Sequence, residues 1–177
     1  MKIRKTNILL AAASLGAIIA FTGCNKDDGA IPERITINDV PTITTNIDPA
    51  GSQFIAMSNT AAFSGKFKVD LYFAGATPPT KIDIVVRKNN LNSTVTNANV
   101  KLYKASITSL PATFTVTAAE IEALFGTPIV LKDIYDFAPD IYVGDRKYEA
   151  FPVTGTGSGV GLNAMPFFSP WTRFEAK

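Results

Sequence analysis

Histidine is missing from this chain of 177 residues, and cysteine occurs once, at Cys24. Without histidine there can be no Ser-His-Asp or Cys-His catalytic arrangement, no histidine ligand for zinc and no histidine that acts as a general base. Carboxylates, tyrosines and lysines remain as catalytic candidates, but none stands in a recognisable motif. We therefore expect a protein that is not an enzyme and that carries no metal and no cofactor.

Long apolar runs are also scarce. The longest, residues 8–21, has 14 residues, whereas a membrane-spanning helix needs roughly 20. Three basic residues, Lys2, Arg4 and Lys5, precede it, and small residues follow it. A charged start, a short apolar centre and a small-residue end are typical of a secretory signal peptide. The sequence therefore predicts that residues 1–23 are removed.

The single cysteine stands at the end of this signal, directly after Thr22 and Gly23. The arrangement resembles the lipobox of bacterial lipoproteins, which implies that Cys24 is acylated with palmitate-type chains and becomes the first residue. A thiol without a partner is unusual in an oxidising compartment, and two or three acyl chains would anchor a domain to a membrane stably. The alternative is an ordinary signal peptide followed by an incidental cysteine.

The residues after the cysteine are polar, and Lys26, Asp27 and Asp28 stand among them. The simplest interpretation of residues 24–33 is a flexible tether between lipid and domain. A lysine and paired acids at this place also resemble the surface-export signal of Bacteroidota lipoproteins. That resemblance implies lipid anchoring at the outer membrane with exposure on the cell surface.

Removing residues 1–23 leaves 154 residues, enough for one domain with its own core, which we place at 34–177. Three of the 17 basic residues leave with the signal, so 14 remain against 15 acidic residues and the net charge becomes −1. No dense basic patch is present, so nucleic acid is not an expected partner.

Short strands separated by turns account for most of residues 34–177. Within residues 65–73, apolar side chains alternate with charged ones, which indicates a half-buried antiparallel strand. Residues 81–88 repeat this alternation. Further strands are expected at 34–49, 100–108, 112–117, 128–137, 140–143, 147–151 and 165–177, with Pro170 limiting the last to an edge or bulged position.

Two irregularities interrupt the strands. The apolar positions of 100–108 change parity between Leu102 and Tyr103, as a β-bulge would make them do. Thr117 and Glu120 form a T-x-x-E capping box ahead of an apolar segment that stops at Gly126, which predicts one helix of about two turns. Seven to nine strands and one short helix predict an all-β fold, an immunoglobulin- or fibronectin-like antiparallel β-sandwich.

The order of FKVDLYF, KIDIVVRK, ATFTVTAAEIEALFG, KYEAFPVTG and a glycine-rich loop is similar to immunoglobulin-like domains of Bacteroidota surface lipoproteins. These include lipoproteins associated with starch-utilisation-type glycan uptake systems. The motifs that carry this resemblance are structural, so sugar binding does not follow from it. We expect a monomeric, non-catalytic binding or scaffolding module that is accessory to glycan or nutrient uptake, with an outer-membrane transporter or a surface glycan as its partner. The alternative is an adhesin or pilus-type subunit that assembles by strand addition at a sheet edge.

Aromatic side chains gather near the C-terminus, where Phe167, Phe168 and Trp171 could form a platform that stacks against a ligand. Because alternate residues of a strand face opposite ways, Phe168 and Phe174 should share one face and Phe167 and Trp171 the other. Packing in the core is the favoured interpretation of this group.

Four aspartates, Asp133, Asp136, Asp140 and Asp145, stand within 13 positions of one another. Their spacing does not match an EF-hand loop, so we interpret them as solvated turn residues rather than as a calcium site. The polar segment 89–99 is expected to be an exposed loop, and the glycine-rich segment 154–161 fits neither a P-loop nor a dinucleotide fingerprint.

Overall fold

A computed structural model describes residues 40–89, 99–152 and 168–177 of the chain. The predictions made for Cys24, Lys26, Asp27, Asp28 and Phe167 fall outside these residues, as do those for 34–39, for most of the 89–99 loop and for the glycine-rich segment.

The smaller sheet has three antiparallel strands in the order β1-β2-β5. Their bounds are Ile43–Ile47 for β1, Ser64–Leu71 for β2 and Ala112–Thr117 for β5. The predicted alternation in β2 is confirmed, because Phe67 and Val69 are fully buried while Lys68 is exposed. Phe67 lies opposite Phe114 of β5, and their rings stack with centroids 5.2 Å apart.

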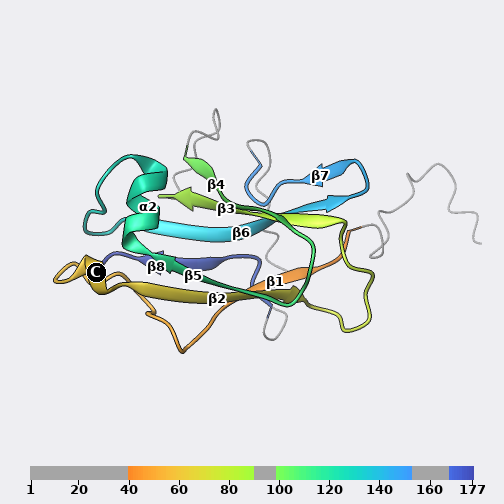
Figure 1. Cartoon of the computed structure of the whole chain (residues 1–177), viewed down its shortest axis with the longest axis horizontal. Helices are drawn as coiled ribbons and strands as arrows, with labels where there is room; N and C mark the ends of the chain where they lie inside the picture. Colours follow the sequence, from red (N-terminus) through yellow and green to blue (C-terminus); the bar gives the residue numbers. More distant parts are fainter. Residues whose placement is uncertain (1–39, 90–98, 153–167) are drawn as a thin grey trace, which may run out of the picture. The chain divides into compact units, whose positions relative to one another are not determined.

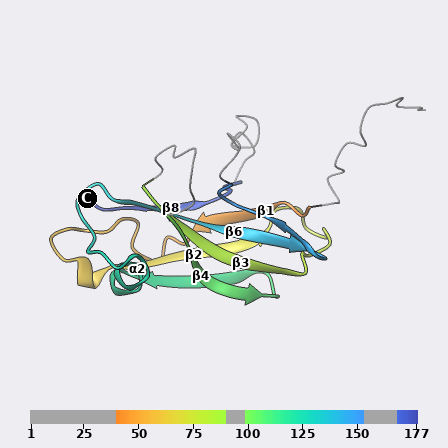
Figure 2. The ribbon, with the colours of Figure 1, turned by 90° about the horizontal axis from the view of Figure 1, so that it is seen from above.

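The larger sheet has five antiparallel strands in the order β4-β3-β6-β7, with β8 also paired to β6. Their bounds are Lys81–Lys88 for β3, Val100–Ile107 for β4, Ile134–Val143 for β6, Arg146–Tyr148 for β7 and Thr172–Glu175 for β8. In Figure 1, β3, β4 and β6 lie above β1, β2 and β5, and Figure 2 shows the same layers from above.

The core lies between the two sheets. The larger sheet contributes Ile82, Ile84, Val86, Tyr135, Phe137 and Phe174, and the smaller sheet contributes Phe67, Val69 and Val116, all fully buried. Each such side chain stabilises the fold by about 1.5–3 kcal/mol relative to exposure. The expectation of an antiparallel β-sandwich is confirmed.

The α-helix in the described part of the chain, α2, spans Ala118–Phe125 between β5 and β6, and a 3-10 turn, η1, spans Thr60–Ala62. The predicted capping box is confirmed: Glu120 N–H donates to the Thr117 side chain, and Thr117 N–H donates to the Glu120 carboxylate at 2.9 Å. Gly126 ends the helix in the left-handed region at φ +68°, which glycine adopts without strain.

The predicted irregularity in β4 is also confirmed. Ile84 of β3 pairs with Lys104, but its neighbour Val85 pairs with Leu102, so Tyr103 is the extra residue of a bulge. A second register shift separates Lys104 from Ile107, and Ser106 there has φ +57°. Two bulges in one strand re-aim its side chains, which brings Tyr103 into the core against Phe137.

Strand boundaries differ from the prediction in three places. The strands expected at 128–137 and 140–143 are one strand, β6, which begins only at Ile134. The segment before it turns instead, because the buried Asp133 carboxylate accepts the Val130 N–H. The expected strand 147–151 is the shorter β7, and Pro170 precedes β8 rather than lying within it.

Pro139 shows how β6 can stay continuous. It lies opposite Ile84 of β3, between the residues of β6 that pair with β8 and those that pair with β7. Proline has no backbone N–H, and a sheet tolerates it where no neighbouring strand needs that donor.

Candidate functional site

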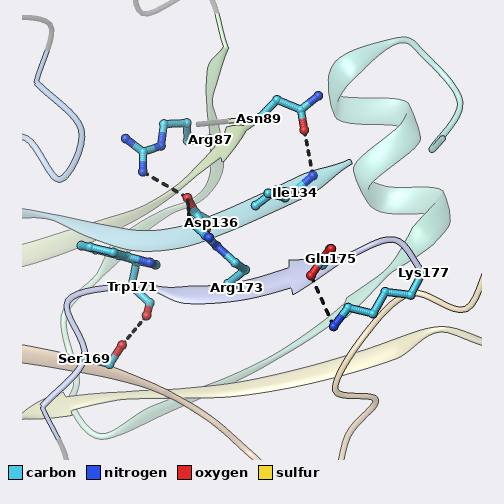
Figure 3. A network of polar contacts seen from close by, with 9 residues as sticks. All are labelled: Arg87, Asn89, Ile134, Asp136, Ser169, Trp171, Arg173, Glu175 and Lys177. Atoms are coloured by element: carbon cyan, nitrogen blue, oxygen red, sulfur yellow. Dashed lines mark hydrogen bonds and ion pairs between the residues drawn. The ribbon is translucent and has the colours of Figure 1, made fainter. Parts of the chain in front are cut away.

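A row of three charged side chains crosses the outer face of the larger sheet. Arg87 on β3, Asp136 on β6 and Arg173 on β8 are direct register partners (Figure 3). The Arg87 guanidinium donates to Asp136 Oδ2 at 3.0 Å, and Arg173 donates through Nε to Oδ1 at 2.7 Å and through Nη2 to Oδ2 at 3.1 Å. Two arginines therefore share one carboxylate.

Burial differs along this row. Asp136 is fully buried, the Arg87 side chain is 22% exposed and the Arg173 side chain is 41% exposed. Arg87 also lies over the Phe151 ring at 4.1 Å, and its Nε has no hydrogen-bond partner within residues 40–89, 99–152 and 168–177. The hydrogen bonds from Arg173 to Asp136 raise the pKa of Arg173, so this guanidinium stays charged. The row carries one net positive charge.

Next to the row, a hollow of about 450 Å³ lies between β1 and the start of β8. Its lining residues are Thr45, Asn46, Ile47, Ser169, Trp171, Thr172 and Arg173. As far as the described residues go, the lining contains one cation and no acidic residue. Trp171 and Arg173 are two positions apart at β8 and so lie on the same side of the chain, as Figure 3 shows.

Hydrogen bonds between β1 and the segment before β8 fix one end of this hollow. Thr45 N–H donates to the Ser169 carbonyl at 2.6 Å, and the Thr172 hydroxyl donates to the Thr45 carbonyl at 3.3 Å. The Ser169 hydroxyl donates to the Trp171 carbonyl, which holds the backbone before β8 in a turn. Asn46 donates to the Thr44 hydroxyl at 3.0 Å.

Trp171 rests on an apolar cluster, which limits how far its indole can move. Val85, Ala138 and Phe151 form the buried part of this cluster, and half-buried Trp171 packs against it. Packing of this kind preorganises the aromatic ring before any ligand arrives.

A second hollow of about 340 Å³ lies on the same face of the sheet, between β4 and the segment after β7. Asp83 and Asp140, which are register partners, both line it. Asp83 accepts the Ser106 N–H at 2.7 Å and lies 3.6 Å from Lys81, and Asp140 lies 2.9 Å from Lys147. Each carboxylate in this hollow already has a cationic partner.

Burial acts to raise the pKa of Asp83, but hydrogen bonds from Ser106 and Tyr142 and the charge of Lys81 outweigh it. The pKa of Asp83 therefore lies below its ordinary value, and the group is ionised at neutral pH. The hollow is polar and close to charge balance.

The expectation that the four aspartates are solvated turn residues is wrong for three of them. Asp133, Asp136 and Asp140 are buried, and only Asp145 is exposed. Each buried carboxylate is satisfied by hydrogen bonds or ion pairs, and those of Asp133 and Asp136 include partners that lie far away in the sequence. Asp133, for example, accepts from Asn89 at 2.8 Å and from the Tyr135 hydroxyl at 3.1 Å. Among the described residues no group of three or more His, Cys, Asp or Glu could hold a metal ion.

The predicted aromatic platform is divided by the structure. Trp171 lines the hollow beside β1, whereas half-buried Phe168 packs edge-to-face against Tyr72 with ring centroids 5.3 Å apart. Phe174, expected with Phe168 on one face, is fully buried in the core, as the favoured interpretation required. Whether these aromatics bind a ligand stays a prediction.

Sequence reasoning missed Arg87, Arg173 and Asn46, and it considered Asp136 only as a turn residue or a calcium ligand. One signal was available: Arg87 and Arg173 occupy positions that alternate with core residues, so both had to lie on the outer face. Nothing in the sequence showed that β3, β6 and β8 would align them with one aspartate.

Comparison of the chain with known protein families, with curated proteins and with solved structures finds no match. The part of the chain that the structure describes has no helix long and apolar enough to cross a membrane. Fold and site together define an antiparallel β-sandwich with a cationic hollow at its side.

Proposed function

We propose that this protein is a non-catalytic binding module that is anchored by lipid to the cell surface and assists glycan or other nutrient uptake at the outer membrane. The observation that carries the binding role is the preorganised hollow of Trp171 and Arg173 beside β1. Ligand sites are typically concave, with apolar and aromatic walls and a few fixed polar groups.

The strand order supports an immunoglobulin- or fibronectin-like class for this sandwich. The first, second and fifth strands form one sheet, and the third, sixth and last strands lie in the other, as strands A, B, E and C, F, G do in that fold. Strand β4 joins the second group at its edge, beside β3, in the place of strand C′. A fold of this kind serves many functions, so the binding role depends on the site.

The anchor depends on the sequence around Cys24. Acylation there would confine the domain to a membrane surface, and Lys26, Asp27 and Asp28 would direct it outward. Confinement raises the effective concentration near a transporter that shares the membrane, so weak contacts would suffice.

Assembly by strand addition is less well supported, because both edges of the larger sheet are poor templates. Strand β4 has two bulges and carries Lys101 and Lys104, features that discourage pairing. At the other edge of the sandwich, the segment after β8 is already paired: Ile55 N–H donates to the Glu175 carbonyl and Lys177 N–H donates to the Ile55 carbonyl, both at 2.9 Å.

Surface labelling of intact Bacteroidota cells tests the proposed location. Wild-type protein should be labelled and should fractionate with membranes. Cys24→Ala should be lost from the membrane fraction. A triple replacement of Lys26, Asp27 and Asp28 by Ala should stay in the membrane fraction but should not be labelled on intact cells. If wild-type protein is labelled only after the cells are permeabilised, the surface role is wrong.

Sedimentation of the purified domain distinguishes a binding module from a pilus-type subunit. A binding module should stay monomeric, whereas a subunit that exchanges strands should form a series of oligomers.

A further inference from the structure

We propose that the hollow between β1 and β8 binds an acidic sugar, a glycan residue whose ring lies against Trp171 and whose carboxylate pairs with Arg173. This inference rests on the proposed function for the general class of ligand, a glycan, and adds the charge that the ligand must carry. It also assigns the residues that would recognise that charge.

Charge selects the ligand. Among the described residues, Arg173 is the one ionisable residue that lines the hollow, and the carboxylate that it contacts, Asp136, is fully buried and shared with Arg87. The charge of Glu175 also acts on Arg173, but Glu175 forms its own ion pair with Lys177 at 3.3 Å. Two guanidinium groups around one carboxylate therefore still leave a net positive charge beside this hollow. A carboxylate on the ligand would supply the missing anion.

Free donors are available on Arg173. Its Nε and Nη2 bond to Asp136, while Nη1 has no partner among the described residues. Guanidinium groups carry five N–H donors in a fixed plane, so the outer edge of Arg173 can still hold a carboxylate. Because Asp136 already fixes this plane, little side-chain freedom would be lost when a ligand binds.

The aromatic wall selects a ring. Trp171 and Arg173 are two residues apart on one side of the chain, a separation of roughly 6.6 Å along an extended strand. A pyranose ring against the indole would place a carboxylate substituent of that ring toward the guanidinium. The apolar C–H face of a sugar packs well on a flat aromatic surface, and the cluster beneath Trp171 holds the indole still.

Polar groups for sugar hydroxyls come from β1. Asn46 lines the hollow and donates one N–H to the Thr44 hydroxyl, whereas its carbonyl oxygen and its second N–H have no side-chain partner in the described part of the chain. An amide can donate to one hydroxyl and accept from another, as recognition of a sugar requires.

The second hollow provides a built-in comparison. Its lining has three acids, Asp83, Asp140 and Glu149, against two lysines, Lys101 and Lys147, so it lacks the net positive charge that would attract a ligand carboxylate. Exposed Lys101 also lines it and forms no ion pair among the described residues, so Lys101→Gln removes one positive charge outside the proposed site.

Isothermal titration of the purified domain with trigalacturonate and with its methyl ester tests the charge requirement on unaltered protein. Loss of a charge-assisted hydrogen bond weakens affinity by roughly 10- to 100-fold, so the acid should bind at least about tenfold more tightly than the ester. Added NaCl should weaken binding of the acid and leave the ester nearly unaffected.

Variants then assign the residues. Arg173→Gln should remove the preference for the acid, Trp171→Ala should weaken both ligands, and Lys101→Gln should behave as wild type. Thermal unfolding of each variant checks that the fold persists, and the comparison of acid with ester on wild type stands even if one variant unfolds.

Equal affinity for acid and ester would overturn the inference. So would tight binding of a penta-aspartate peptide with no binding of trigalacturonate, because the ligand would then be an acidic peptide. Binding of neutral glycans that is insensitive to Arg173→Gln would overturn the inference but keep the proposed function. No binding to a broad panel of neutral and acidic glycans would remove the glycan role itself.

Discussion

Replacement of Asp136 by Asn tests how the charged row is held together. The change is nearly isosteric, but it removes the charge that Arg87 and Arg173 share and puts an N–H₂ group beside one of them. Asp136 is fully buried and accepts three hydrogen bonds from the two guanidinium groups. The variant therefore leaves two cations without their anion.

The magnitude follows from burial. Removing one partner of a buried ion pair costs about 3–5 kcal/mol, because the remaining charge is left uncompensated. Arg173 can turn toward water, since 41% of its side chain is exposed. Arg87 can do so less easily, because only 22% of its side chain is exposed and its guanidinium lies against the Phe151 ring. We expect Asp136→Asn to lower the free energy of unfolding by about 3 kcal/mol, the lower end of that range. Arg173→Gln should cost less, about 1 kcal/mol, since Arg87 still neutralises Asp136.

Urea unfolding followed by the fluorescence of Trp171 measures these differences. A loss of about 3 kcal/mol should lower the melting temperature by roughly 6–12 °C in a domain of this size. Asp145→Asn, at an exposed aspartate, is the matched control and should change stability by less than about 0.5 kcal/mol. If Asp136→Asn is as stable as this control, or if Arg173→Gln is the more damaging variant, the account of the row is wrong.

Three further predictions concern pH and local structure. Burial acts to raise the pKa of Asp133, but the hydrogen bonds that it accepts lower the pKa below its ordinary value. The stabilisation that the ionised Asp133 gives the fold is therefore full above pH about 4 and is lost as the pH falls through the lowered pKa. Asp133→Asn should make stability depend less on pH at acid pH. Without histidine, stability should be nearly constant from pH about 5 to 8, and a transition in that range on unfolding titrations would contradict this. A Cβ on Gly65 would lie 2.6 Å from Phe63 and 2.8 Å from Phe174, so Gly65→Ala should lower the free energy of unfolding by about 1–3 kcal/mol in chemical denaturation. A Cβ on Gly126 would meet no described atom within 4 Å, so Gly126→Ala should cost only about 1 kcal/mol, through the positive φ of this residue.

Loss of the helix cap is a smaller effect that the same denaturation assay can resolve. Thr117→Ala removes the acceptor for the Glu120 N–H and should cost about 1 kcal/mol. Thr117→Ser keeps the hydroxyl and should lie close to wild type. Equal losses in both variants would show that the cap contributes through packing rather than through its hydrogen bond.

Features set by short-range chemistry could be predicted from the sequence. The alternation in β2, the capping box of α2, its end at Gly126 and the bulge at Tyr103 each depend on residues a few positions apart. Their side chains favour one local conformation, and the tertiary packing is compatible with that conformation. The alternation expected for β3 is wrong as a burial pattern, because Asp83 and Val85 on its outer face are buried as well. The β-sandwich followed because many short strands with one helix have few other ways to bury their apolar faces.

The site could not be read in the same way. Trp171 was identified by its chemistry, but its neighbours in the hollow come from β1, more than 120 positions earlier. Asp136 was interpreted as a turn residue because the residues around it give no information on its partners, Arg87 and Arg173, which lie 49 and 37 positions away in the sequence. Only strand pairing decided that two arginines and one aspartate would form a row.

The sequence alone determined the strands, the helix and the absence of histidine chemistry, because these depend on composition and on neighbours along the chain. The tertiary structure decided which acids are buried, which cation stays unbalanced and where a hollow opens. Those properties depend on the register between β3, β6 and β8 and on the position of β1 beside them, and long-range pairing of this kind leaves no mark in local sequence.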